Sequence, residues 1–560
     1  MQNPLSILGQ LLVSPFRLGL GYLENRLLLK HRALLLELTP KTLSRFEMGK
    51  PAFRALNALA QADDLRLLVI RIEVTPKGWA SLLAFRSAIE TIRASGKSVW
   101  VHLLHPYRDG LYLASAADQI FVLPHSALFW NGLGNRMFFY AGMLKQFGVV
   151  ADIESAGSYK SFGESYANRF PSPENREQLQ SIYGSLEQHI LEAISEGLKI
   201  PEAVLKQTFM ESPLSSERAQ ELGFVHGEHY GEELLEKAKE FVGASNTPPN
   251  FMSWFGLFQF QQRLKRIGDT RRQVALVSLK GTVIDQGEGV VISPQQVVPL
   301  LKRLREDKRI AAVILKINSP GGSAVASDRI AHAIEQLSFQ KPVVALLENV
   351  AASGGYYIAA RCHEIIAYPT TVTGSIGVVG GKLTVSGALQ KLGITSELIV
   401  PSSDRQGMFD ITQPFSPDQR VRFRAFLKLT YARFLDVVAM GRKLPLEAVA
   451  SVAEGRVWTG IQALEHKLVD ALGTETTALK HAARLSGLRS SEFRVVRMSF
   501  EPSLRQKVRS QFSAIRSHDE THSLKSVGMS FLRQSPIAQL LLLHPLEALM
   551  IYDESDEGFR

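Results

Sequence analysis

AVILKINSPGG, residues 312–322, is the most informative stretch of the chain for its architecture. An apolar run that ends in Asn-Ser-Pro-Gly-Gly predicts a buried strand followed by a tight turn. LLVIRIEVTPKG, residues 67–78, has the same pattern about 245 residues earlier, and a helical pattern follows both stretches. Repeated strand, turn and helix units are typical of buried, largely parallel sheets, so the sequence predicts an α/β fold.

The match between these two stretches extends along most of the chain. KSVWVHLL from Lys97 corresponds to KPVVALLE from Lys341, and GLYLASAADQIFVLP, ending at Pro124, corresponds to GYYIAARCHEIIAYP, ending at Pro369. Further on, LKQFGV, SPENREQ and KIPEAV correspond to LQKLGI, SPDQRVR and KLPLEAV in the same order. Chance would not preserve that order, so the chain contains two tandem copies of one unit.

In the second copy, the spacing of apolar residues predicts particular strands and one long helix. The helix is expected from about Ser416 to Arg442, where apolar residues recur at helical spacing. The strands are expected at Val274 to Leu279, Ala312 to Ile317, Val343 to Leu347 and Glu364 to Ala367.

Composition restricts the possible functions. With 560 residues, 45% of them hydrophobic and 21% charged, the chain is expected to be globular with about three or four units. Its single cysteine, Cys362, allows neither an internal disulfide nor a thiolate cluster, and no His-Glu-x-x-His pair is present, so no metal or other cofactor is expected. The net charge of +10 is compatible with a basic soluble protein or a membrane surface, and no nucleic-acid partner is expected.

The first forty residues combine leucines with basic side chains. No apolar run reaches the roughly 18 to 20 residues that span a bilayer, and no signal cleavage site follows. An amphipathic helix lying on the membrane surface fits best, and a helix packed on the protein's own core is the alternative. The segment FMSWFGLFQFQQRLKRIGDTRR, residues 251–272, holds five Phe or Trp and five Arg or Lys residues, which suit either a second membrane contact or inward packing.

The candidate nucleophile is Ser353, in ENVAASGGYYIAA, residues 348–360. It stands between an apolar strand and a predicted helix, where a turn exposes the side chain and directs helix N–H groups at a developing negative charge. An N–H of Gly321 or Gly322, in INSPGGSAVAS, could complete an oxyanion hole with the N–H of Gly354. The alternatives are a plain N-cap serine and a tight turn between strand and helix.

At these residues the sequence resembles the bacterial signal peptide peptidases, also called protease IV, in their long two-repeat form. NSPGGS, AASGGYYIA and TGSIGV, residues 373–378, are similar to the nucleophile-half motifs of that family, and GSYKS, residues 157–161, to its base-half motif. The resemblance covers roughly residues 50–485. It implies a fold of two tandem repeats of ββα units, similar to Clp protease and crotonase, and a Ser/Lys dyad with Ser353 as nucleophile and Lys160 as general base. It also implies that Ser375 orients the lysine.

The comparison of the two copies also supports this pairing. Ser353 corresponds to Arg108 in the first copy, and Lys160 corresponds to Arg405 in the second, so each copy retains one half of the dyad. A lysine base needs burial that lowers its pKa from about 10.4 to about 7 or 8. The alternative for Lys160 is a solvated surface lysine. A Ser/His/Asp triad is disfavoured, because none of the histidines, His363 included, is well placed.

We therefore expect a serine endopeptidase that degrades cleaved signal peptides and other short apolar peptides. A crotonase-like acyl-thioester enzyme and a catalytically silent membrane scaffold are the alternatives. The resemblance further implies a homotetramer at the inner cell membrane, peripheral or monotopic, with the side of the membrane left open.

Five segments are expected along the chain. They are an amphipathic membrane-associating segment (1–48), a first repeat carrying the base (49–245), an aromatic and basic linker (246–272), a second repeat carrying the nucleophile (273–490) and a tail of unknown role (491–560).

Overall fold

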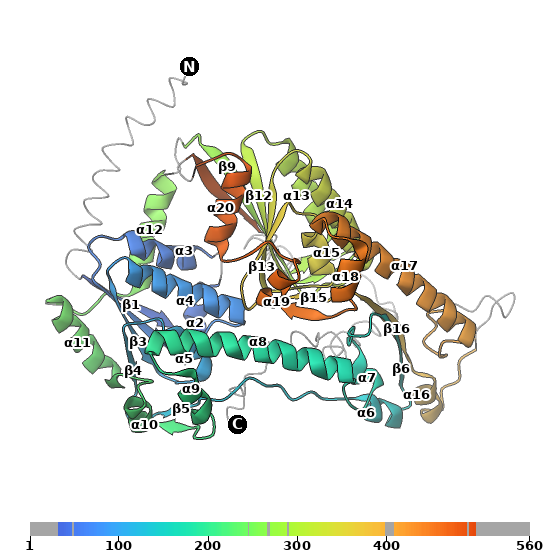
Figure 1. Ribbon diagram of the computed structural model, residues 1–560, viewed down its shortest axis with the longest axis horizontal. Coiled ribbons are helices and arrows are strands. Elements are labelled where there is room, and N and C mark those ends of the chain that lie inside the picture. Colours follow the sequence, from blue (N-terminus) through green and yellow to red (C-terminus); the bar gives the residue numbers. More distant parts are fainter. Residues whose placement is uncertain are drawn as a thin grey trace, which may run out of the picture. The chain divides into compact units, whose positions relative to one another are not determined.

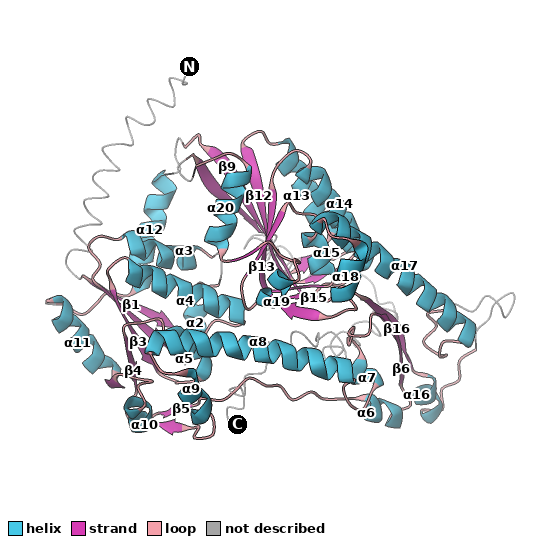
Figure 2. Ribbon diagram, viewed as in Figure 1, coloured by secondary structure: helices cyan, strands magenta, loops and turns pink. Residues whose placement is uncertain are grey.

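The computed structural model describes residues 32–47, 50–244, 246–265, 269–287, 290–397, 408–489 and 492–499. The chain forms two compact units (Figure 1). Unit 1 comprises Met1–Leu133 and Gly184–Arg271, and unit 2 comprises Gly134–Tyr183 and Arg272–Arg560. Both units combine strands with covering helices (Figure 2), which confirms the α/β fold class.

Unit 1 is built on one parallel sheet with the strand order β1-β2-β3-β4-β8. Successive side chains of a strand point to opposite faces. One set packs against α3, α4 and α5, and the other set packs against α11. The strands are β1 (Ala33–Leu38), β2 (Leu67–Ile72), β3 (Ser98–Leu103), β4 (Gln119–Val122), β5 (Ala127–Leu128), β7 (Leu214–Ser215) and β8 (Gly227–Glu228). The helices are α2 (Pro40–Leu43), α3 (Pro51–Ala58), η1 (Leu59–Gln61), α4 (Trp79–Ala94), α5 (Arg108–Ala114), α9 (Glu202–Thr208), α10 (Ser216–Glu221), α11 (Gly231–Val242) and α12 (Phe251–Lys265).

Unit 2 repeats this topology with additional strands. Its path β9-β12-β13-β14-β18 is parallel throughout and matches the order of the unit 1 sheet, while β15, β17 and β19 extend it. The strands are β6 (Val150–Ala156), β9 (Arg272–Lys280), β10 (Thr282–Val283), β11 (Val291–Ile292), β12 (Ile310–Ser319), β13 (Val343–Ala352), β14 (Glu364–Ala367), β15 (Val372–Gly374), β16 (Val378–Thr384), β17 (Val457–Thr459), β18 (Ala471–Leu472) and β19 (Phe493–Ser499).

The helices of unit 2 cover both faces of this sheet. α13, α14 and α15 share the main core with one face, and α20 contacts β12 and β13 from the other (Figure 1). The helices are α6 (Ala141–Gln146), α7 (Glu164–Ala167), α13 (Pro294–Glu306), α14 (Ala324–Ser338), α15 (Gly354–Ala359), α16 (Ser386–Lys391), α17 (Pro417–Arg442), α18 (Leu446–Val452), α19 (Gly460–Glu465) and α20 (Glu475–Leu485). The long helix α8 (Pro173–Leu198) contributes its first part to unit 2 and its second part to unit 1.

A close backbone contact occurs at corresponding places in the two units. A methyl group placed on Gly197 of α8 would lie 2.0 Å from the carbonyl oxygen of Ser115, just after α5. A methyl group placed on Gly441 of α17 would lie 1.8 Å from the carbonyl oxygen of Ala360, just after α15. Both long helices therefore need glycine where they cross the end of a short helix.

The strands and the long helix expected in the second copy are present. β14 has the expected bounds, and β9, β12 and β13 extend beyond the predicted strands at one or both ends. α17 begins one residue after Ser416, whose side chain caps the helix by accepting the N–H of Gln419.

The structure places some segment boundaries differently from the sequence prediction. Residues 33–38 form β1, because the run ALLLEL pairs with β2 and is almost wholly buried. Residues 134–183 belong to unit 2, and β19 brings residues 493–499 into the unit 2 sheet beside β9. In the expected linker, Phe251 and Trp254 are buried in the unit 1 core, so these two aromatic side chains pack inward.

Residues 1–31 of the expected N-terminal amphipathic helix and most of the C-terminal tail lie outside the described residues, whereas residues 33–38 form a strand in place of that helix. Within the described part of the chain, every helix is too short or too polar to cross a bilayer.

Two glycines of α8 provide a test of the close contact in unit 1. Gly197→Ala should lower the free energy of unfolding by about 1–3 kcal/mol, because the methyl group would collide with the Ser115 carbonyl. Gly184→Ala, on the same helix with open space around it, should raise stability by about 0.5–1 kcal/mol through helix propensity. Urea denaturation measures both, and equal effects of the two substitutions would contradict the contact.

Candidate active site

Ser353 occupies a strained turn at the end of a buried strand. All ten residues of β13 are buried, and Ser353 follows the last of them and precedes α15. Its backbone has φ 52° and ψ −121°, a conformation that costs a residue with a side chain about 1–3 kcal/mol. Its N–H donates to the carbonyl oxygen of Gly374 at 2.9 Å, which helps to hold the turn. The strained turn fixes the hydroxyl at the carboxyl end of the sheet.

Ser375 lies beside Ser353 because their strands are paired. β13 and β15 are parallel, and their last residues, Ala352 and Gly374, are in register. The residue that follows each strand is a serine. Ser375 also has a positive φ of 52°, and its N–H donates to the carbonyl oxygen of Arg456 at 2.7 Å. Two strained serine turns therefore stand side by side.

Lys160 reaches these serines through the antiparallel pair β6 and β16. Ala156, at the end of β6, is in register with Val378, at the start of β16. Lys160 follows Ala156 by four residues and Ser375 precedes Val378 by three, so both lie at the same end of the pair. The Nζ atom of Lys160 lies 3.0 Å from Ser353 Oγ, 2.8 Å from Ser375 Oγ and 3.1 Å from the Ser375 carbonyl oxygen.

About half of the Lys160 amine is uncharged at neutral pH. Burial lowers the pKa of the Lys160 amine from its usual 10.5 to about 7, and no carboxylate opposes this effect. A neutral amine has two N–H donors and one lone pair. Ser375 offers two acceptors, its carbonyl oxygen and its Oγ, so the lone pair remains for the hydroxyl proton of Ser353.

The three candidate oxyanion glycines have different surroundings. The N–H of Gly321 donates to Ser319 Oγ at 3.1 Å and is therefore engaged. Within the described residues, the N–H groups of Gly322 and Gly354 have no hydrogen-bond acceptor. They lie close together, since a methyl group placed on Gly354 would be 3.3 Å from the Gly322 nitrogen. Gly322 and Gly354, not Gly321, thus offer a pair of free donors beside Ser353.

The residue of the first copy that corresponds to Ser353 has a structural role. Arg108, which aligns with Ser353, donates to the Gly132 carbonyl oxygen at 3.1 Å, and its guanidinium lies 5.5 Å from the centre of the Trp79 ring. Arg405, which aligns with Lys160, lies outside the described residues.

His363 is far from Ser353. It accepts the N–H of Val343, at the opposite end of β13 from Ser353, about 30 Å away at the usual rise per strand residue.

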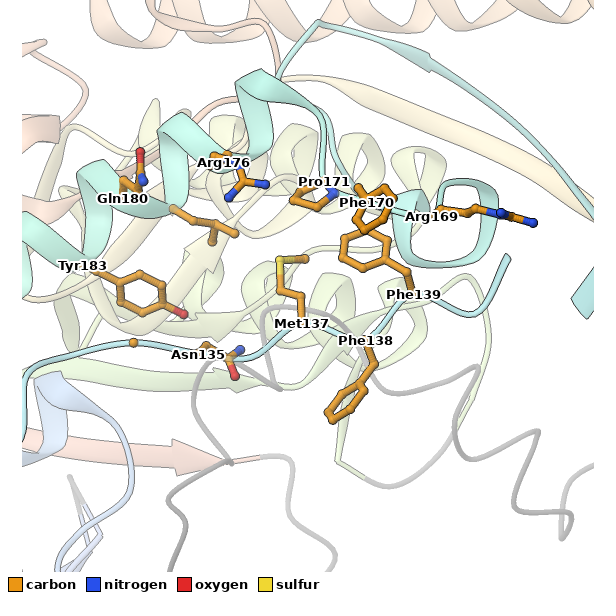
Figure 3. A pocket seen from close by; sticks show the side chains of 12 residues that line it. Asn135, Met137, Phe138, Phe139, Arg169, Phe170, Pro171, Arg176, Gln180 and Tyr183 are labelled. Carbon is orange, nitrogen blue, oxygen red and sulfur yellow. The ribbon is translucent and has the colours of Figure 1, made fainter. Parts of the chain in front are cut away.

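A groove of about 570 Å³ lies on the same segment as Lys160 but contains neither Lys160 nor Ser353 (Figure 3). Tyr183 of α8 points toward the extended stretch that carries Asn135 and Met137, and Gln180 of the same helix also lines the groove. The remaining lining residues are Gly134, Phe138, Phe139, Arg169, Phe170, Pro171, Arg176 and Leu179. The dyad residues therefore lie outside this groove.

The sequence analysis did not identify one segment that contacts the candidate site residues. The turn Glu454–Arg456, between α18 and β17, contacts both Lys160 and Ser375. The signal that could have found it is the tripeptide Glu-Gly-Arg just before the short strand at Val457, since a glycine there marks a turn or a close approach of two backbones.

A strained serine, a buried lysine amine whose pKa is lowered to about 7 and two free N–H donors are the features of a serine hydrolase site. Comparison with known proteins identifies the family within this class. The model of Peptidase family S49 matches residues 91–245 and 335–489, one range in each copy and together more than half of the chain. The chain belongs to peptidase family S49 and is a serine peptidase by family. This membership confirms the two-repeat family resemblance and leaves the acyl-thioester alternative without support.

Three relatives illustrate the similarity. The chloroplastic serine protease SPPA of Arabidopsis thaliana is 27% identical, over 77% of this chain and 65% of that protein. Protease 4 of Salmonella typhi is 29% identical, over 78% of this chain and 72% of that protein. Protease 4 of Haemophilus influenzae is 28% identical, over 80% of this chain and 74% of that protein. The chain thus spans about two thirds to three quarters of the length of these relatives.

The lowered pKa of Lys160 predicts how stability depends on pH. Between about pH 7 and pH 10 the unfolded chain binds a proton at Lys160 that the folded chain does not, so wild-type stability should rise with pH in this window. Lys160→Met removes this dependence. From pH 7.5 to pH 9.5, the unfolding free energy of the wild type should therefore rise by about 2 kcal/mol relative to that of Lys160→Met. Urea denaturation at both pH values measures it, and an unchanged difference would show that the amine is not desolvated.

Proposed function

We propose that this chain is an endopeptidase in which Ser353 is the nucleophile and Lys160 the general base. The observation that carries the proposal is the 3.0 Å separation between Lys160 Nζ and Ser353 Oγ, together with the pKa of about 7 that burial gives the amine. An uncharged amine at this distance can accept the hydroxyl proton directly, so neither a histidine nor a metal ion is required.

In the first half of the proposed reaction, Ser353 Oγ attacks the carbonyl carbon of the scissile peptide bond as its proton passes to Lys160 Nζ. The carbonyl oxygen becomes an oxyanion that accepts the N–H groups of Gly322 and Gly354, and each such donor is typically worth about 100 to 1,000-fold in rate. The tetrahedral intermediate then collapses and breaks the C–N bond. The Lys160 ammonium gives its proton to the leaving amine, and an ester on Ser353 remains.

In the second half, water hydrolyses this ester. Lys160, neutral again, takes a proton from the water as its oxygen bonds to the acyl carbon. When the second tetrahedral intermediate collapses, the proton on Lys160 returns to Ser353 Oγ and the carboxylic acid product leaves. Ser375 keeps the lone pair aimed at the reacting atoms in both halves, because its two acceptors hold the two N–H bonds of the amine.

The proposed substrates are cleaved signal peptides and other short apolar peptides at the membrane surface. The support is the resemblance of NSPGGS, AASGGYYIA, TGSIGV and GSYKS to the signal peptide peptidases. We further propose a homotetramer at the inner cell membrane, attached peripherally or monotopically through residues 1–48. Within that segment, residues 1–31 mix leucines with basic side chains and lie outside the described residues, so the attachment is proposed for the part that precedes β1.

Substitution of the two dyad residues tests the mechanism. Ser353→Ala should abolish labelling by a fluorophosphonate and lower peptide turnover by about 10⁴-fold or more. Lys160→Arg should lower turnover to a similar extent with an intact fold, because a guanidinium does not deprotonate. Lys145→Arg, an exposed lysine on the same segment, is the matched control and should retain wild-type turnover. Turnover by Lys160→Arg would remove Lys160 as the base.

The same assay tests the substrate class separately. Peptides with an uncharged apolar central run should be cleaved faster than peptides of equal length with a polar central run. Equal rates would contradict the proposed substrates and leave the dyad mechanism intact.

The pH dependence of catalysis should follow deprotonation of Lys160. Because only the neutral amine can accept a proton, kcat/KM should rise with pH through an apparent pKa of about 7. The value at pH 6 should be about tenfold lower than at pH 8, measured with a peptide that has no group titrating in this range. An acidic limb near pH 10 would mean that the base keeps the pKa of an ordinary lysine.

A further inference from the structure

The turn Glu454–Arg456 hydrogen-bonds to the turn that carries Lys160. The N–H of Tyr159 donates to the Glu454 carbonyl oxygen at 2.8 Å, and the N–H of Ser158 donates to Glu454 Oε2 at 3.0 Å. Glu454 itself has a positive φ of 51°. Two neighbours of the general base are thus attached to one residue nearly three hundred positions later in the chain.

The same turn also hydrogen-bonds to the Ser375 turn. The N–H of Ser375 donates to the Arg456 carbonyl oxygen at 2.7 Å, and the N–H of Gly455 donates to the Ile376 carbonyl oxygen at 2.8 Å. The Glu454–Arg456 turn therefore links the residue that carries the amine to the residue that accepts its hydrogen bonds.

The three turns touch without space for side chains. A methyl group placed on Gly455, whose φ is 78°, would lie 2.5 Å from Lys160 Cβ and 2.7 Å from its Cα and N. One on Gly157 would lie 2.5 Å from the Glu454 carbonyl carbon, and one on Gly377 would lie 2.7 Å from Gly455 Cα. Because backbone atoms cannot move aside cheaply, these contacts fix the position of the Lys160 backbone.

Side chains hold the Glu454–Arg456 turn from outside. The hydroxyl of Tyr431, on α17, accepts the Glu454 N–H at 3.0 Å and donates to Glu454 Oε1 at 3.2 Å. The Arg456 guanidinium donates to both carboxylate oxygens of Glu177, and it lies 4.8 Å from the centre of the Tyr159 ring. The turn is therefore braced on two sides, by α17 and by the segment that carries Lys160.

The first copy lacks the glycine of this turn. Thr459 caps α19 after β17, and Ser215 caps α10 after β7, so the two caps correspond. Counting back from these caps, Gly455 corresponds to Glu211, which forms a salt bridge with Arg218. Glycine thus stands at this position in the copy whose turn contacts Lys160, and a bulky residue stands there in the other copy.

We propose that the Glu454–Arg456 turn is the positioning element of the dyad, and that its contact with Lys160 sets how far the amine lies from Ser353. The inference rests on the proposed function, since it assigns a role relative to that base. Neither Glu454 nor Gly455 touches the reacting atoms, so both act through Lys160.

Gly455→Ala is the direct test. The added methyl group must displace the Lys160 backbone, and a misplacement of about 1 Å can reduce catalysis about 100-fold. We expect kcat to fall about 100-fold while KM changes by less than about threefold, because substrate contacts remain. The acidic limb of kcat/KM should also move above pH 7, since a displaced amine is better hydrated. Gly487→Ala, with a φ of 66° and no atom within 4 Å, imposes similar backbone strain without a collision and should leave kcat and the pH profile unchanged.

A second variant covers the case in which Gly455→Ala does not fold. Tyr431→Phe removes the hydroxyl that holds Glu454 and adds no atom, so kcat should fall about three- to tenfold with the same upward shift of the acidic limb. If Gly455→Ala folds and retains wild-type kcat and pH profile, or if it does not fold and Tyr431→Phe retains them, the positioning role is wrong. Activity of Lys160→Met would instead overturn the proposed function, so the two failures are distinguishable.

Discussion

The proposed active site of unit 2 depends on keeping the amine of Lys160 in its neutral form at hydrogen-bonding distance from the hydroxyl of Ser353. Burial alone lowers the pKa of Lys160, and its neighbours are the neutral oxygens of Ser353 and Ser375. A carboxylate at either position would stabilise the ammonium and raise the pKa again. The fold must therefore surround the amine with polar atoms that carry no charge, which backbone carbonyls and serine hydroxyls supply.

Strand pairing brings these neutral groups together. The parallel register of β13 and β15 sets the two serines side by side, and the antiparallel register of β6 and β16 brings the lysine to the same place. β6 is held on unit 2 by ion pairs from Arg420 of α17 to Asp152 and Glu154, and by Arg424 to Glu154 at 2.6 Å. These carboxylates lie on β6, before the turn that carries Lys160. Their charges attach the strand to α17, and burial alone lowers the pKa of Lys160.

Local patterns in the sequence were sufficient to predict several strands and the long helix, but not all of the residues that these elements contact. The strand at Glu364–Ala367 and the long helix that begins near Ser416 follow from residue type and spacing. The run at Ala33–Leu38 is too short for periodicity to distinguish strand from helix, and its pairing with β2 decides the matter. The Glu454–Arg456 turn was not predicted, because its contacts are with the turns of Lys160 and Ser375, which lie far away in the chain. Ser353 was predicted from its place between a strand and a helix, and Lys160 from the family resemblance. Comparison of the two copies supported this pairing, because it tests long-range relationships that local patterns do not contain.

The two copies keep the same sheet order and the same glycine contact under their long helices, yet they differ at the positions of Ser353 and Gly455. Arg108 stands in the place of Ser353, and its guanidinium satisfies a backbone carbonyl and covers Trp79. Glu211 stands in the place of Gly455, where a side chain would collide with the lysine turn in unit 2. A strained turn costs stability, so the strained conformation of Ser353 is expected where chemistry requires it. In unit 1, which lacks the serine, both positions instead carry arginine or glutamate side chains in ordinary ion pairs and hydrogen bonds.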